Sequence, residues 1–215
     1  QFTYHGFRYV RVRGGQNWTK EQFTALAVST ENPVTGSFAC SDERLNQLQH
    51  NIYWSQRSNN ITIPTDCPTR EKAGWTGDVV VYGATALYNQ DMTAFYEDWL
   101  KSIRLEQTEN GHVLNTVPLI KNYIQQNEAG SLGWGDVILT LPLQLYHLKG
   151  DLRVLEENYP AMERWMEAMK KSAYELPTAG PMGAVTEEQF ASISKRQQDN
   201  QHYLINTGFH FGDWL

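Results

Sequence analysis

The chain has 215 residues, of which 40% are hydrophobic, and a formal net charge of −6 at pH 7. This composition is typical of a globular protein with a sizeable core, and it excludes a collagen-like or largely disordered chain. The acidic balance and the lack of any Lys/Arg cluster exclude the usual nucleic-acid partners, because phosphates require a basic patch. We therefore expect a small neutral or cationic ligand and no membrane partner.

The first residues of the chain predict β-structure. Aromatic and β-branched residues recur through residues 2–13, and residues 23–29 show a second such run. Two elements are too few for a domain, because an isolated ribbon is marginally stable in water. We therefore assign residues 1–38 to the last strands of an upstream β-domain, and we expect the chain to be a piece of a longer protein.

After Ser41 the spacing of apolar residues becomes helical. Segments at residues 45–52, 95–103 and 152–169 carry an apolar stripe at intervals of three and four residues, which is typical of amphipathic helices. Between them, residues 79–88 and 137–148 are apolar on nearly all sides, which predicts helices buried on every side. The pattern therefore predicts inner and outer helices that alternate along the chain.

A short motif of glycine, tryptophan and aspartate precedes each inner helix. Its repetition predicts successive helical hairpins. Stacked hairpins close into a toroid in which the inner helices all begin at one end, so these corners would converge on one cavity. The three corners are Trp75-Thr76-Gly77-Asp78, Gly133-Trp134-Gly135-Asp136 and Phe211-Gly212-Asp213-Trp214.

Each corner residue also has a purely structural explanation. Aspartate is a preferred N-cap, so any one of the three aspartates could serve only to accept hydrogen bonds from a helix start. Any one of the three tryptophans could be a core residue. Three tryptophans beside aspartates are better explained as platforms for the apolar faces of sugar rings. A capping carboxylate at a cavity rim can also still present an oxygen to a ligand.

The run from Asp66 to Asp78, D-C-P-T-R-E-K-A-G-W-T-G-D, predicts a loop with binding or catalytic chemistry, because ionisable groups are crowded beside an aromatic ring. A general acid must keep its proton near neutral pH, which burial or a neighbouring carboxylate can achieve. Asp66 and Asp78 flank Glu71, which makes Glu71 the candidate acid. Arg70 and Lys72 would oppose this if they touched Glu71, so we expect them to pair with Asp66, Asp78 or substrate hydroxyls. The alternative is an exposed, salt-bridged turn.

This run also resembles the signature of the bacterial α-L-rhamnosidases, glycoside hydrolase family 78. The resemblance covers nearly the whole chain, because residues 5–10 resemble the segment that closes the β-domain and the two later corners resemble later parts of the cavity. It implies an (α/α)6 barrel, an inverting mechanism, a rhamnose-containing glycoside or oligosaccharide as substrate, and Glu71 as general acid. The implied pocket residues are Asp66, Arg70, Trp75, Asp78, Trp134, Asp136, Asp213 and Trp214.

By the same resemblance, residues 39–215 form the first part of the barrel. An inverting enzyme needs a second carboxylate about 6.5–9.5 Å from the acid to activate water. In the family this base lies on a later hairpin, so we expect it beyond residue 215 and expect residues 1–215 alone to be inactive. Glu128 is the only loop carboxylate of the chain that could substitute.

Two other functions stay open. Another α/α-toroid glycosidase, such as a glucuronyl hydrolase or a trehalase-like enzyme, would share the cavity, but the run from Asp66 to Asp78 argues against it. A non-catalytic carbohydrate-binding module would keep the aromatic pocket, but the intact Glu71 argues against that.

The remaining sequence features predict no cofactor and no metal. The six histidines are scattered and show no ligand spacing. Cys40 and Cys67 lie in different contexts, which favours two free thiols over a disulfide. They do not indicate the compartment. We expect a soluble protein of the bacterial cytoplasm or the periplasm, or an exported one.

Overall fold

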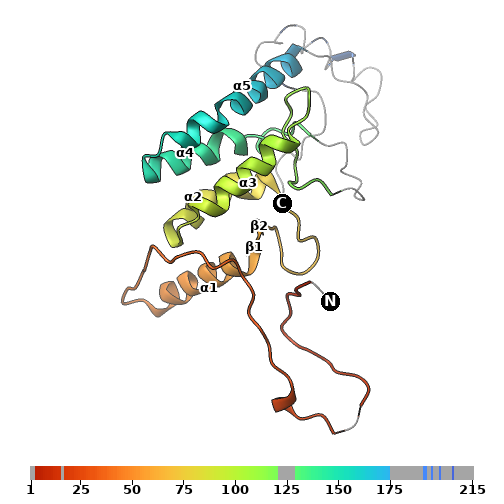
Figure 1. Ribbon diagram of the computed structural model, residues 1–215, viewed down its shortest axis with the longest axis vertical. Helices are drawn as coiled ribbons and strands as arrows, with labels where there is room; N and C mark the ends of the chain where they lie inside the picture. Colours follow the sequence, from red (N-terminus) through yellow and green to blue (C-terminus); the bar gives the residue numbers. More distant parts are fainter. Residues whose placement is uncertain are drawn as a thin grey trace.

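The structure is a computed structural model that describes residues 3–15, 17–120, 129–174, 191–192, 195, 199 and 205. Within these residues the fold is mainly helical (Figure 1). Its elements are η1 (Lys20–Gln22), α1 (Glu43–Asn59), β1 (Asn60–Ile61), β2 (Ile63–Pro64), α2 (Thr76–Asn89), α3 (Thr93–Glu106), α4 (Val137–Lys149) and α5 (Arg153–Tyr174). The five helices predicted between residues 45 and 169 are confirmed, and the third inner helix, after the corner at residues 211–214, lies outside the described residues.

The helices form two hairpins that lie side by side. One hairpin is α2 and α3, and the other is α4 and α5. Helix α2 packs against α4, α4 packs against α5, and α3 contacts both helices of the second hairpin. Figure 1 shows α1 on the opposite side of α2, joined to it through β1 and β2. Successive hairpins stacked in chain order are the arrangement expected for the first part of a helical toroid.

The core lies between α2, α3, α4 and α5. Its largest fully buried side chains are Trp99 and Trp165. The Trp99 indole N–H donates to the Val117 carbonyl at 2.9 Å, and the Trp165 indole N–H donates to Oδ1 of Asp136 at 3.0 Å. A buried indole needs such a partner, because an unpaired N–H would lose its bond to water.

The predicted stripe of α3 is buried as expected. The stripe predicted along α5 is largely wrong, because Leu152, Tyr159 and Met166 are 53%, 58% and 46% exposed. The buried face of α5 instead carries Val154, Ala161 and Trp165.

The strands predicted in residues 1–38 are wrong for this structure. The described part of this segment is extended, and apart from η1 its regular structure is one isolated bridge between Val34 and Gln90. Tyr9, Val10 and Leu26 are exposed. The alternating residues suit a strand, but a strand also needs a neighbour for its backbone N–H and C=O groups, and no described segment provides one. That residues 1–38 belong to an upstream β-domain stays a prediction.

Two smaller expectations are also corrected. The short antiparallel pair of β1 and β2 comes after α1, where no strand was expected. The inner helices are not buried on every side, because Val81 and Tyr88 of α2 are 84% and 72% exposed and Leu143 of α4 is 46% exposed. The described elements leave these three side chains uncovered. None of the helices described is both long and apolar enough to cross a membrane.

Candidate active site

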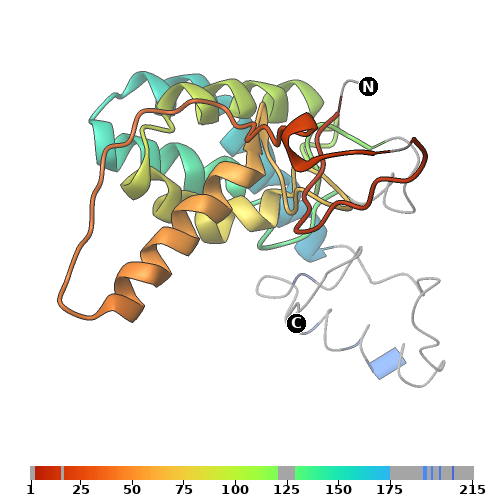
Figure 2. The same ribbon diagram turned by 90° about the horizontal axis from the view of Figure 1, so that it is seen from below.

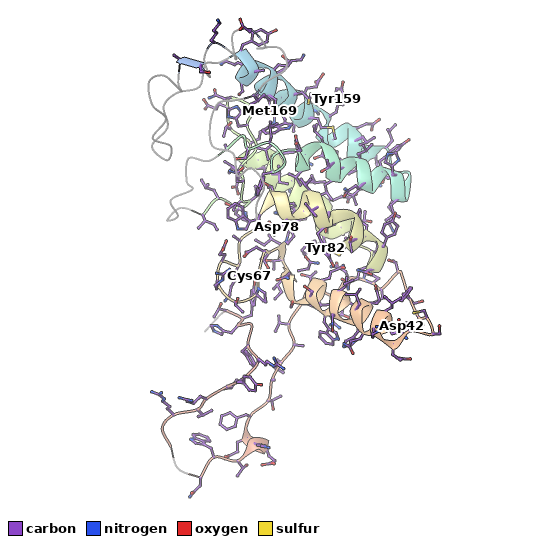
Figure 3. All side chains as sticks on the ribbon, turned by 180° about the vertical axis from the view of Figure 1, so that it is seen from behind. Asp42, Cys67, Asp78, Tyr82, Tyr159 and Met169 are labelled. Carbon is purple, nitrogen blue, oxygen red and sulfur yellow. The ribbon has the colours of Figure 1, made fainter. Side chains whose placement is uncertain are left out.

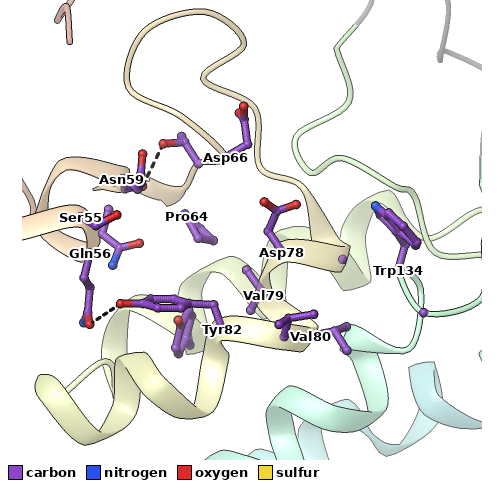
Figure 4. Close-up of a pocket in the computed structure, with 16 residues that line it drawn as sticks. Ser55, Gln56, Asn59, Pro64, Asp66, Asp78, Val79, Val80, Tyr82 and Trp134 are labelled. Carbon is purple, nitrogen blue, oxygen red and sulfur yellow. Dashed lines mark hydrogen bonds between the residues drawn. The ribbon is translucent and has the colours of Figure 1, made fainter. Parts of the chain in front are cut away.

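A pocket of about 590 Å³ opens where the end of α1, the start of α2 and the corner before α4 meet (Figure 4). Its volume lies in the usual range for small-molecule sites. The pocket has a largely apolar floor from α2 and a polar wall from the end of α1. The residues that line it are Ser55, Gln56, Asn59, Asn60, Pro64, Thr65, Asp66, Gly77, Asp78, Val79, Val80, Val81, Tyr82, Tyr96, Gly133 and Trp134.

The structure brings together three residues that the sequence singled out. Asp66 and Asp78, at the two ends of one loop, and Trp134, from a segment more than fifty residues later, all line this pocket (Figure 4). Trp134 packs closely on the start of α2, because a Cβ added at Gly77 would lie 2.6 Å from its indole ring. Two of the three predicted corners therefore meet at one pocket. Asp213 and Trp214, in the third corner, lie outside the described residues.

The acid loop, which we define as residues 66–78, is closed on itself at its base. The Asp66 N–H donates to the Ala73 carbonyl, and the Ala73 N–H donates to Oδ1 of Asp66, both at 3.0 Å. Beyond this clamp, Val117 N–H donates to the Gly74 carbonyl at 2.9 Å. A Cβ at Gly74 would lie 2.0 Å from the Val117 carbonyl oxygen, so only glycine permits this approach.

Glu71 is held inside this loop by two contacts. The indole N–H of Trp75 donates to Oε2 of Glu71 at 2.8 Å, and the Glu71 N–H donates to Sγ of Cys67 at 3.4 Å. The carboxylate therefore has a defined orientation before any substrate binds. Trp75 was expected as a sugar platform, and the structure gives its N–H a different task, which is to orient the candidate acid.

The Cys67 thiol collects N–H donors from the turn around it. Burial and a hydrogen bond with Asp66 each raise the pKa of Cys67, but the backbone N–H groups of Arg70, Glu71 and Lys72 outweigh them and bring the pKa below its ordinary value. Cys67 and Cys40 are both free thiols, as expected. Figure 3 shows Cys67 and Asp78 near the junction of α1 and α2, far from α5.

Asp78 is the carboxylate of this pocket whose pKa is raised. Burial raises its pKa above the ordinary value, and the nearby carboxylates of Asp66 and then Glu71 raise it further. Asp78 keeps an accessible surface because the pocket it lines is open. Three acidic side chains thus lie close enough to influence one another, which is a frequent property of acid–base sites.

The raised pKa of Asp78 predicts a pH-dependent stability difference. A raised pKa means that the folded protein binds the proton more tightly than the unfolded chain, so this stability is present below the ordinary aspartate pKa and is lost as pH rises through the raised one. Asp78→Asn, which stays neutral, should therefore gain thermal stability relative to wild type as pH rises from acid to neutral. The control is Asp98→Asn on the exposed face of α3. A difference that stays constant with pH, or that changes in the other direction, would contradict the electrostatic assignment.

The aspartates do not cap their helices in the expected way. Asp78 lies in the first turn of α2, whose N-cap position is held by Trp75. Asp136 occupies the N-cap position of α4, but its side chain accepts from the Gly133 N–H at 3.0 Å and from Trp165. Asp136 is not among the residues that line the pocket. These contacts give it a structural task, and its contact with a sugar stays a prediction.

Neither basic residue of the acid loop forms the expected ion pair with Asp66 or Asp78 in the part of the chain that the structure describes. Lys72 was expected to pair with Asp66, Asp78 or a substrate hydroxyl. Instead its ammonium group donates to the Tyr4 carbonyl and lies 4.7 Å from the centre of the Tyr4 ring. Arg70 is exposed on the loop and does not line the pocket.

The sequence missed the polar side chains that α1 contributes to the pocket. Gln56 is 1% exposed, and its Oε1 accepts from the Tyr82 hydroxyl at 3.1 Å and from Nδ2 of Asn89 at 2.9 Å (Figure 4). The network continues from Nε2 of Gln56 to Oε1 of Gln90 at 2.9 Å. Burial raises the pKa of Tyr82, so this phenol stays a neutral donor on the pocket floor. Gln56 is the one buried residue of α1, and a glutamine on an amphipathic helix gives no signal that it turns inward.

No metal cluster is formed by the parts of the chain that the structure describes, where groups of three or more His, Cys, Asp or Glu side chains in ligating positions are absent.

The described residues thus form a helical-hairpin domain with two carboxylates and a tryptophan gathered at the start of its inner helices. A family model for the bacterial alpha-L-rhamnosidase 6 hairpin glycosidase domain matches residues 33–215. The chain belongs to this family.

Named relatives agree with this assignment. The chain is 37% identical to an alpha-L-rhamnosidase of Formosa agariphila over 97% of its own length and 23% of that protein. It is 38% identical to an alpha-L-rhamnosidase of Streptomyces avermitilis over 80% of its own length and 16% of that protein. The chain thus spans less than a quarter of the length of these two relatives.

Solved structures agree as well. The alpha-L-rhamnosidase from Dictyoglumus thermophilum superposes with a TM-score of 0.64 at 30% identity, covering 81% of this chain and 22% of that one. The Streptomyces avermitilis alpha-L-rhamnosidase complexed with L-rhamnose gives a TM-score of 0.64 at 30% identity, covering 80% of this chain and 18% of that one.

Proposed function

We propose that the complete protein removes terminal α-L-rhamnose from rhamnosides by an inverting mechanism in which Glu71 is the general acid. The observation that carries this is the closeness of Glu71 to Asp78, because Asp78 lines the pocket although Glu71 itself does not. The Glu71 carboxylate accepts from the Trp75 N–H at 2.8 Å and lies close enough to Asp78 to raise the pKa of that residue. Glu71 gives its proton to the glycosidic oxygen as the bond from that oxygen to the sugar breaks.

The sugar is bound by the pocket residues on either side of the acid loop. Asp66 and Asp78 accept hydrogen bonds from sugar hydroxyls, and Trp134 provides an apolar face for the ring. A relative crystallised with L-rhamnose supports the choice of sugar. Arg70, Trp75, Asp136, Asp213 and Trp214 stay candidates for the same site on the family resemblance alone.

The attacking water needs a second carboxylate that removes its proton on the opposite face of the sugar. We place this general base outside residues 1–215, on a later hairpin. Glu128 is the alternative within the chain, and it lies outside the described residues. Residues 1–215 expressed alone are therefore expected to show no turnover.

The test is to follow the complete protein by proton NMR as it cleaves an aryl α-L-rhamnoside. Inversion predicts that the first sugar released is β-L-rhamnose, which then equilibrates with the α-anomer. The two alternative glycosidases are tested beside it with aryl β-glucuronide and trehalose. No cleavage of the rhamnoside, or α-L-rhamnose as the first product, would contradict the proposal.

A further inference from the structure

The acid loop makes contacts with a segment far away in the sequence. Residues 3–6, which we call the N-terminal strap, run beside the loop between β2 and α2 (Figures 1 and 2). The Gly6 N–H donates to the Pro68 carbonyl at 3.0 Å. A Cβ added at Gly6 would lie 2.6 Å from Cγ2 of Thr69, so strap and loop are in close contact. The strap lies outside residues 33–215, the part matched by the family model.

Lys72 connects the strap to the loop by its charge. Its ammonium donates to the Tyr4 carbonyl, lies 3.4 Å from Oγ1 of Thr3 and sits over the Tyr4 ring. Hydrogen bonds from an ammonium group and its attraction to an aromatic face are each among the stronger polar contacts. The residue itself has a φ of 51°, in the left-handed region that residues other than glycine rarely adopt. The strap contacts stabilise this conformation.

These contacts bear directly on Glu71, the next residue in the chain. Without these contacts the backbone at Lys72 could leave its left-handed conformation. The hydrogen bond from the Glu71 N–H to Cys67 would then weaken, and Glu71 would lose its fixed position. The strap therefore fixes the backbone from which the acid projects.

We propose that the N-terminal strap and Lys72 position Glu71, so that a segment outside the hairpin domain completes the geometry of the acid. This inference rests on the proposed function. Lys72 acts here as a positioning residue and touches no substrate. A misplaced catalytic group can cost roughly 10- to 100-fold in rate without a change in fold.

The experiment compares Lys72→Met and Gly6→Ala in the complete protein. The first keeps the length of the side chain and removes its charge, and the second pushes the strap away from Thr69. Both should lower kcat roughly 10- to 100-fold for a rhamnoside with a poor leaving group, with little change in KM. A rhamnoside of an activated phenol should lose much less, because it needs little protonation. Lys72→Arg should keep most of the activity, since a guanidinium can make the same contacts.

The control is Lys101→Met, an exposed position on α3 that should leave both rates unchanged. Hydrogen–deuterium exchange of a peptide covering the acid loop gives a readout that does not need activity. Faster exchange in Lys72→Met and Gly6→Ala, but not in Lys101→Met, is expected.

The outcomes separate the two proposals. Unchanged exchange in both variants overturns the inference whatever the enzyme cleaves. Rates that fall equally on the two rhamnosides, or that do not fall, also overturn it. If the wild type cleaves no rhamnoside, the proposed function fails, and exchange alone decides whether the strap orders the loop.

Discussion

Glu71→Gln in the complete protein should lower the rate for a rhamnoside with a poor leaving group by on the order of 10²–10⁴-fold. The amide keeps the shape of the side chain, and its oxygen can still accept a hydrogen bond from Trp75. It has no acidic proton to transfer to the leaving group. A rhamnoside of an activated phenol should lose far less, because that leaving group departs without protonation. Steady-state kinetics on the two substrates measure the difference.

The matched control is Glu163→Gln, at an exposed position on α5. It should leave both rates unchanged. An equal loss on both substrates by Glu71→Gln would point to a structural contribution of Glu71, and no loss on either would remove it from the mechanism.

Trp165→Ala should strongly destabilise the fold. Trp165 is fully buried in the core, its N–H is bonded to Asp136, and a Cβ at the neighbouring Gly135 would lie 2.3 Å from its ring. Truncation of a buried tryptophan costs about 3–5 kcal/mol, from lost contacts and the cavity that remains. We expect a clearly lower midpoint of thermal unfolding for the complete protein.

The comparison is with Met166→Ala on the same helix, where the side chain is 46% exposed. That change should cost less than about 1 kcal/mol. Similar midpoints for the two variants would show that Trp165 does not anchor the hairpins.

Much of the fold follows from local signals in the sequence. The apolar stripe of α5 and the apolar run of α4 each mark a helix, because helical spacing of apolar residues is a local property. The strands expected before residue 30 fail for the complementary reason. A strand depends on a neighbour, and the sequence of residues 2–13 does not say whether one is present.

The candidate site also combines residues that the sequence predicts with contacts that depend on tertiary packing. Asp66, Asp78 and Trp134 could be predicted to meet, because each stands beside the start of an inner helix or in the loop before it. The bond that Lys72 donates to Tyr4 joins residues 68 positions apart, and the bond that Tyr82 donates to Gln56 joins residues 26 positions apart. Such long-range contacts depend on tertiary packing, which no local pattern records.

The most direct test of the central claim is a crystal structure of the complete Glu71→Gln protein with an uncleaved aryl α-L-rhamnoside. The account predicts that the rhamnose ring lies in the pocket between Asp66, Asp78 and Trp134. It also predicts that the side chain at position 71 lies within hydrogen-bond distance of the glycosidic oxygen. A sugar bound elsewhere, or a glycosidic oxygen out of reach of position 71, would contradict it.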